Sequence, residues 1–228
     1  MFGCAAPALG ALAWRRIDSA TQREARGAAP PPTASLEALE RLASFPKQGP
    51  NECGAYSAAV ALELSGLPAP SPRAMVAEIS DLFAASEALS GTRPWRLCEA
   101  LSQRGFRAEG AAADHLEGDA RLDLLRSEIA AQRPVIALVE SDRGAEHYVV
   151  VVGYRPGQVD LYDPNVAADP SRPGVTGDLN GALPGNRSES SARFAARWGR
   201  GGMLGLYRFW YLPLRPAGAP RGAPAKSG

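Results

Sequence analysis

Residues 48–66 read QGPNECGAYSAAVALELSG, and the fold is built outward from this stretch. Small and apolar residues run almost unbroken from Asn51 to Leu64, which predicts a buried helix. Asn51 is a favourable N-cap, and Gly66 suits the left-handed position that follows a helix end. Cys53 is therefore expected in the first turn, where free N–H groups and the helix dipole favour a thiolate.

The second half of the chain predicts an antiparallel hairpin. Residues 147–154 (HYVVVVGY) and 159–163 (VDLYD) are rich in strand-forming side chains, and the turn sequence Arg-Pro-Gly lies between them. His147 and Asp163 are an even 16 residues apart, so both can lie on one face and oppose each other in a hairpin centred near Arg155.

The remaining elements place helices mostly before strands. Further helices are predicted over residues 36–43, 72–85, 95–104, 122–132 and 191–198, and further strands over residues 135–139 and 204–214. This order favours an α+β fold, with N-terminal helices packed on a C-terminal antiparallel sheet.

Three parts of the chain differ in composition. Residues 1–34 read as a leader and a proline-rich linker, and residues 214–228 as a Pro/Gly/Ala tail, both expected to be disordered. Residues 35–213 form the predicted folded domain. Within it, residues 169–191 are polar and rich in Gly, Pro and Asn, which predicts a long surface segment.

Composition excludes several classes of function. The chain has 228 residues, of which 45% are hydrophobic, so it can bury a core. It carries 25 Lys and Arg against 24 Asp and Glu, without the basic excess typical of nucleic-acid binding. Three cysteines, no CxxC pair and two histidines favour neither a zinc site nor a disulfide framework, and no metal or organic cofactor is expected.

The N-terminus leaves the location of the protein open. No apolar stretch is long enough to span a bilayer. Residues 2–5 (FGCA) resemble the end of a bacterial lipoprotein signal, so Cys4 is a lipid-anchor candidate if the true start lies upstream. The alternatives are an exported or envelope-tethered protein and a cytoplasmic one. The abundance of Arg, Ala, Gly and Pro favours a bacterial source.

Cys53 and His147 suggest nucleophilic catalysis. A thiol is mostly protonated at neutral pH, and a histidine is the natural partner for an imidazolium–thiolate pair. Asp163 is the predicted group that orients the ring, and Asn165, which shares its parity, is the alternative. Gln48 and the N–H of Cys53 could both point at an oxyanion.

Together these residues resemble the C39-like branch of the papain-like cysteine peptidases. The matching elements are QGPNECG at 48–54, HYVVVVGY at 147–154 and LYDP at 161–164. The resemblance implies that Cys53 is the nucleophile, His147 the general base, Asp163 its orienting group and Gln48 the oxyanion residue. It also implies peptide or protein substrates, cut after small residues such as paired glycines.

The chain departs from that pattern in places. No ATP-binding or membrane-spanning segment of a C39 exporter is present in the sequence. Glu52 places a negative charge beside the thiol, and the surface segment at residues 169–191 is unusually long.

Other functions remain open at this point: acyl transfer or amide hydrolysis by the same nucleophile, or an inactive fold that serves as a binding module. Cys98 is expected to pack in the core and His115 to lie in an exposed loop.

Overall fold

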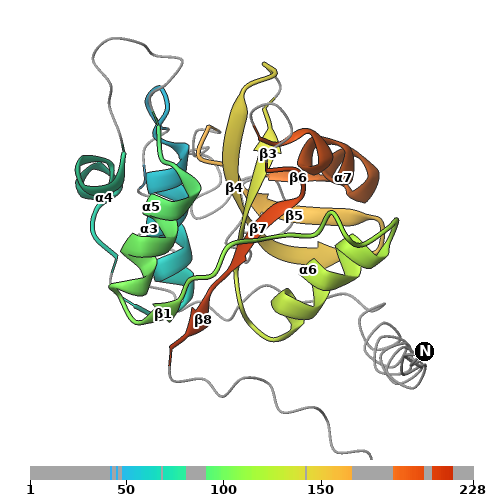
Figure 1. Cartoon of the computed structure of the whole chain (residues 1–228), viewed down its shortest axis with the longest axis horizontal. Helices are drawn as coiled ribbons and strands as arrows, with labels where there is room; N and C mark the ends of the chain where they lie inside the picture. The colour runs from blue at the N-terminus through green and yellow to red at the C-terminus, as the bar shows by residue number, and fades with distance from the viewer. Residues whose placement is uncertain are drawn as a thin grey trace, which may run out of the picture.

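The fold is shown in Figure 1 as a computed structural model. The structure describes residues 42, 45, 48–67, 69–80, 91–141, 143–165, 187–202 and 207–217. The predicted leader and linker, most of the helix expected over residues 36–43, and residues 169–186 of the predicted surface segment lie outside the described residues.

Helices and antiparallel strands make up the described part of the chain. The helices are α3 (Cys53–Leu64), α4 (Pro72–Ile79), α5 (Pro94–Ser102), α6 (Ala120–Ala130) and α7 (Ser191–Arg200). The strands are β1 (Phe106–Arg107), β2 (Ala111–Ala112), β3 (Val135–Glu140), β4 (Glu146–Arg155), β5 (Gln158–Tyr162), β6 (Arg187–Ser190), β7 (Trp210–Pro213) and β8 (Arg215–Pro216). The main sheet has the order β2-β7-β3-β4-β5-β6, and its pairs are antiparallel. The α+β class expected from the sequence is confirmed.

Two cores lie on opposite faces of this sheet. In Figure 1, helices α3, α4 and α5 stand on one side of it, and α6 and α7 on the other. The core on the first side, called the α3 core, joins α3, α4 and α5 to Ile136, Leu138, Tyr148, Val150 and Val152. The core on the second side, called the α7 core, joins α6 and α7 to Val135, Ala137, Val139, Val149 and Val151.

Strand β4 is buried on both faces, which explains its unbroken run of valines. Tyr148 and Val150 belong to the α3 core, whereas Val149 and Val151 belong to the α7 core. Successive side chains of a strand point to opposite faces, so a central strand between two cores needs apolar residues at every position. The run therefore predicts a strand covered by helices on both sides.

Helix α3 is buried along its whole length, because it lies between the sheet and the neighbouring helices. Its C-terminal end follows the prediction: Gly66 has φ 74°, and the N–H groups of Gly66 and Leu67 bond to the carbonyls of Glu63 and Leu62. Its N-terminal end does not, because the cap is Glu52. The predicted cap, Asn51, takes a left-handed φ of 61° one residue earlier.

Other predicted boundaries move when tertiary contacts are formed. Helix α4 ends at Ile79, whereas the prediction extended it to residue 85. Ser80 is extended, and its hydroxyl forms a hydrogen bond with that of Thr92. The last strand is shorter than residues 204–214, since Phe209 has a positive φ of 54° and β7 begins after it.

The ordered structure also passes the predicted domain boundary at residue 213. Leu214 is buried in the α3 core, and Arg215 and Pro216 form β8, which pairs with β1. The composition of this stretch resembles a disordered tail, but pairing with a strand more than 100 residues earlier orders its first residues.

Candidate active site

Cys53 is the first residue of α3 and is buried, with 8% of its surface exposed. The first N–H groups of a helix lack partners within the helix, and the positive end of the helix dipole lies there. The carboxylate of Glu52, expected to oppose a thiolate, accepts a 2.6 Å hydrogen bond from the N–H of Gly49. Its charge is thus directed toward the preceding loop, which it ties to the start of the helix.

His147 lies near the beginning of β4 and is 5% exposed. Its Nε2 is 2.7 Å from Oδ1 of Asp163. Burial lowers the pKa of the ring, but hydrogen bonds to Asp163 and Cys53, together with their charges, outweigh this effect and raise the pKa to about 9. The ring therefore lies between a carboxylate and a thiol, and its imidazolium form is stabilised by both.

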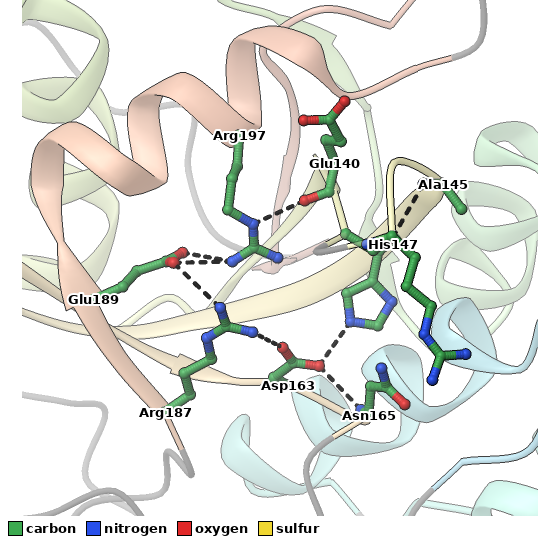
Figure 2. A network of polar contacts seen from close by, with 10 residues as sticks. Glu140, Ala145, His147, Asp163, Asn165, Arg187, Glu189 and Arg197 are labelled. Atoms are coloured by element: carbon green, nitrogen blue, oxygen red, sulfur yellow. Dashed lines mark hydrogen bonds and ion pairs between the residues drawn. The ribbon is translucent and has the colours of Figure 1, made fainter.

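Asp163 directly follows β5 and is 1% exposed. Besides the contact with His147, Oδ1 accepts a 3.0 Å hydrogen bond from the N–H of Asn165, and Oδ2 accepts one of 2.9 Å from Nη1 of Arg187 (Figure 2). Burial raises the pKa of this carboxyl, but the hydrogen bond and charge of His147, the Asn165 N–H and the charge of Arg187 lower it to about 2. The carboxylate is therefore ionised throughout the neutral range.

Asn165, the alternative orienting residue, contributes through its backbone. Its side chain is exposed, and its N–H group is what reaches the Asp163 carboxylate. Of the two candidates that the sequence left open, Asp163 is the one bonded to the His147 ring.

A bulge in the β4–β5 ladder aligns His147 with Asp163. Gly153 pairs with Asp160, but Val151 pairs with Leu161, so the register shifts by one residue between these pairs. Without the shift, Asp163 would follow the strand on the face opposite to His147.

The predicted shared face is therefore right, but the predicted register is wrong. Continuing the shifted register places Asp163 opposite Val149, so it meets His147 diagonally rather than directly across the ladder. The separation of 16 residues gave the correct parity, whereas the sequence contains no signal for the extra residue at Val152.

Gln48 is bonded to the loop that follows β5, next to Asp163. Its N–H donates a 3.0 Å hydrogen bond to the carbonyl of Pro164, the residue after Asp163. The oxygen of its side-chain amide is buried and has no hydrogen-bond partner in the structure. The loop before α3 is thus fixed to the loop after β5, and Gln48 presents a buried amide end with unused hydrogen-bonding capacity.

Gly54, which follows Cys53, permits a close contact between two segments. A Cβ at this position would lie 2.4 Å from Cβ of Thr92. Thr92 is buried, so the glycine allows this segment to pack against the first turn of α3.

Sequence reasoning missed Arg187. It lies in the segment expected to be a surface excursion, yet it begins β6 and binds Asp163. Its one local signal is alternation, since Arg187 and Glu189 are two residues apart and lie on one face of the short strand. Four residues are too few to distinguish such a pattern from chance in a polar segment.

The other singled-out residues lie outside this cluster. His115 is exposed, as predicted. Cys98 is partly buried against the α3 core, and burial raises the pKa of its thiol. In the part of the chain that the structure describes, no group of three or more His, Cys, Asp or Glu side chains could hold a metal ion. Over the same residues, no helix has the length and apolar character needed to cross a membrane.

Comparisons with known proteins give a likeness of fold at low identity. No protein-family model matches the chain, and no curated protein matches it. Among solved structures, the peptidase domain of Streptococcus ComA, a bi-functional ABC transporter involved in a quorum-sensing pathway, is 18% identical, with 75% of this chain and 96% of that one covered and a TM-score of 0.44. A C39-like peptidase from Bacillus anthracis is 14% identical over 76% and 95%, with a TM-score of 0.48.

The peptidase domain of Streptococcus mutans ComA is 19% identical over 75% of this chain and 98% of its own, with a TM-score of 0.37. The chain is thus similar to C39 peptidase domains. At these identities and TM-scores the likeness supports no conclusion about chemistry, which has to be derived from the residues of the site.

Proposed function

We propose that this protein is a papain-like cysteine peptidase that hydrolyses peptide bonds with Cys53, His147 and Asp163. The observation that carries the proposal is the buried contact of 2.7 Å between the His147 ring and the Asp163 carboxylate, with the buried Cys53 near enough to raise the pKa of the ring. The three residues are contributed by separate parts of the sequence. A buried histidine held between a carboxylate and a thiol has a direct use in nucleophilic catalysis and little use in packing.

The geometry suits a thiolate–imidazolium pair. Because Nε2 of His147 is bound to Asp163, Nδ1 is the nitrogen left to exchange a proton with Cys53. The raised pKa of the ring means that it holds this proton over the neutral range. Cys53 then attacks the substrate carbonyl carbon as a thiolate, and His147 donates its proton to the leaving amine.

Hydrolysis of the resulting thioester completes the cycle. His147, now neutral, takes a proton from water, whose oxygen attacks the acyl carbon. The acyl group leaves as a carboxylic acid when its bond to the Cys53 sulfur breaks. Cys53 is then a thiolate again, and His147 keeps the proton that it took from water.

Gln48 is the proposed oxyanion residue, together with the N–H of Cys53. An oxyanion donor has to be buried, held in place and free of other partners, so that it can bind the charge that develops on the carbonyl oxygen. Three features of Gln48 support this role: one end of its amide is buried, that end has no hydrogen-bond partner, and the backbone of the residue is anchored to Pro164. The oxygen and nitrogen of an amide exchange places by rotation, so Nε2 can occupy the free position.

The nucleophile can be tested by alkylation with iodoacetamide followed by peptide mapping. We expect rapid labelling of Cys53 in the folded protein, loss of that label in Cys53→Ala, and its retention in the matched control Cys98→Ala. Labelling of Cys53 should also abolish hydrolysis of test peptides, beginning with sequences that contain paired glycines.

Two results would overturn the proposal. An unreactive Cys53 in folded protein would instead favour an inactive binding module. Transfer products that exceed hydrolysis when an amine is added would favour acyl transfer over peptidase activity.

A further inference from the structure

We propose that Arg187 is a positioning residue, which binds one oxygen of Asp163 and thereby holds the other oxygen against the His147 ring. The inference rests on the proposed function, because it assigns a role within the same site. Arg187 would touch neither the substrate nor the reacting atoms and would act through Asp163.

Three adjacent strands carry the three side chains. His147 lies on β4, Asp163 follows β5, and Arg187 lies on β6 opposite Leu161. Since Leu161 precedes Asp163 by two residues, Arg187 and Asp163 share a face and meet diagonally. The carboxylate is therefore bound from both sides along the sheet, by the ring on one side and by the guanidinium on the other.

These two contacts use different oxygens of the carboxylate. Oδ1 is 2.7 Å from Nε2 of His147, and Oδ2 is 2.9 Å from Nη1 of Arg187. The side chain of Asp163 is 2% exposed and that of Arg187 is 19% exposed, so water screens the pair only weakly. Rotation of the carboxylate would break both contacts together, and each contact therefore opposes the loss of the other.

Arg187 also forms an ion pair with Glu189, on the side of its guanidinium away from Asp163 (Figure 2). Its Nη2 lies 3.6 Å from Oε2 of Glu189, and both oxygens of Glu189 accept hydrogen bonds from Nη1 of Arg197, at 2.7 and 3.0 Å. Arg197 is anchored in turn by a 2.7 Å bond from its Nε to the carbonyl of Glu140 (Figure 2). The chain of alternating charges joins the ring of His147 to α7 and to the end of β3, and it fixes the position of the guanidinium.

A second arginine–aspartate pair in the same sheet provides a matched control. Arg155 donates to Asp160 at 3.0 and 2.6 Å, and the side chain of Asp160 is 4% exposed. As in the pair of Arg187 and Asp163, the carboxylate is almost completely buried, and here the arginine binds it through two nitrogens. Both side chains also form hydrogen bonds with the hydroxyl of Ser188, on the side away from the candidate active site. Arg155→Gln should therefore reproduce the structural cost of losing such a pair without its effect on the site.

The first test is a double-mutant cycle on kcat/KM. Arg187→Gln is expected to lower kcat/KM about tenfold, mainly through kcat, because one charge-assisted hydrogen bond to the orienting carboxylate is lost. Arg187→Lys should restore most of the activity. In the background of Asp163→Asn, Arg187→Gln should cost less than about twofold, since its effect passes through Asp163.

The proposal is wrong if Arg187→Gln lowers kcat/KM by the same factor in the Asp163→Asn background as in the native protein. It is also wrong if the control Arg155→Gln lowers kcat/KM as much as Arg187→Gln does. Either result would assign Arg187 to support of the fold alone.

The second test does not require activity, so it separates this inference from the proposed function. The chain has two histidines, and the exposed His115 serves as an internal reference for an NMR titration of His147. In Arg187→Gln the His147 pKa should rise by roughly half a unit, because the imidazolium no longer shares the carboxylate with a guanidinium. Arg155→Gln should leave it unchanged.

An unmoved His147 pKa in Arg187→Gln would show that Arg187 does not act on the pair. If the pKa moves while the protein hydrolyses no peptide, the positioning contact stands and the proposed function fails.

Discussion

Asp160 and Asp163 are three residues apart at the end of one strand, and both are almost completely buried. Each accepts hydrogen bonds from an arginine of a neighbouring strand. The partners differ, however. Asp160 is bonded to Arg155 and to the hydroxyl of Ser188, neither of which changes its charge near neutral pH.

Asp163 shares its carboxylate between Arg187 and the His147 ring, and the charge of that ring can change. Burial and an ion pair are thus common to both sites and indicate nothing about function. The distinguishing feature is that the titratable partner of Asp163 also interacts with Cys53, the proposed nucleophile. Matched substitutions of the two aspartates therefore test whether Asp163 and His147 take part in catalysis.

The largest effect is expected when the titratable partner is removed. Under the proposed function, His147→Ala should lower kcat by at least about a thousandfold, because the thiolate loses its base and the leaving amine loses its proton donor. Circular dichroism and thermal unfolding should show that the variant stays folded. Peptidase activity close to that of the native protein would exclude His147 from the reaction.

A separate contrast between the aspartates is expected to be nearly as large. Asp163→Asn should lower kcat/KM by about a hundredfold or more, because an amide cannot stabilise the imidazolium. Asp160→Asn should change kcat/KM by less than about threefold while lowering the thermal midpoint, because a buried ion pair is broken. Equal kinetic losses in the two variants would mean that the aspartates do not differ in role.

The pH dependence of the free energy of unfolding should also distinguish Asp163, which is bonded to His147, from Asp160, which is not. The folded pKa of His147, about 9, lies above its ordinary value of 6.5, so its contribution to stability is complete below about 6.5 and is lost as the pH rises through 9. The folded pKa of Asp163, about 2, lies below 3.8, so its contribution is complete above about 4 and is lost as the pH falls through 2.

Urea unfolding at a series of pH values measures both effects. The decline of the free energy of unfolding between pH values of about 6.5 and 9 should be reduced in His147→Gln and retained in Asp160→Asn. An unchanged decline in His147→Gln would assign it to other groups.

The smallest effect is expected at Asn165. Because its backbone N–H, and not its side chain, reaches Asp163, Asn165→Ala should reduce kcat/KM by less than about threefold. A loss as large as that of Asp163→Asn would make Asn165 the orienting residue and reverse the assignment.

Local pattern was sufficient for much of the fold and for the candidate residues. The buried helix with Cys53 in its first turn, the valine-rich hairpin and the α+β class follow from short-range regularities that a sequence displays directly. Gln48 and His147 could be selected because each lies beside such an element. The parity of His147 and Asp163 was correct, although the register behind it was not.

The rest depends on pairing between distant segments. The bulge at Val152, which brings His147 and Asp163 to one face, is a property of the ladder and not of either strand alone. Strand β8 forms in a stretch with the composition of a disordered tail, because β1 supplies the missing partner.

The places of Cys53 and His147 in the fold could thus be predicted from the sequence, because a helix start and a strand start are local features with recognisable residue preferences. Arg187 was decided by the tertiary structure. It joins Asp163 from 24 residues away, in a strand of four residues that forms only because β5 lies beside it. Its contact with the carboxylate depends on the register of that pairing, which nothing in residues 187–190 encodes.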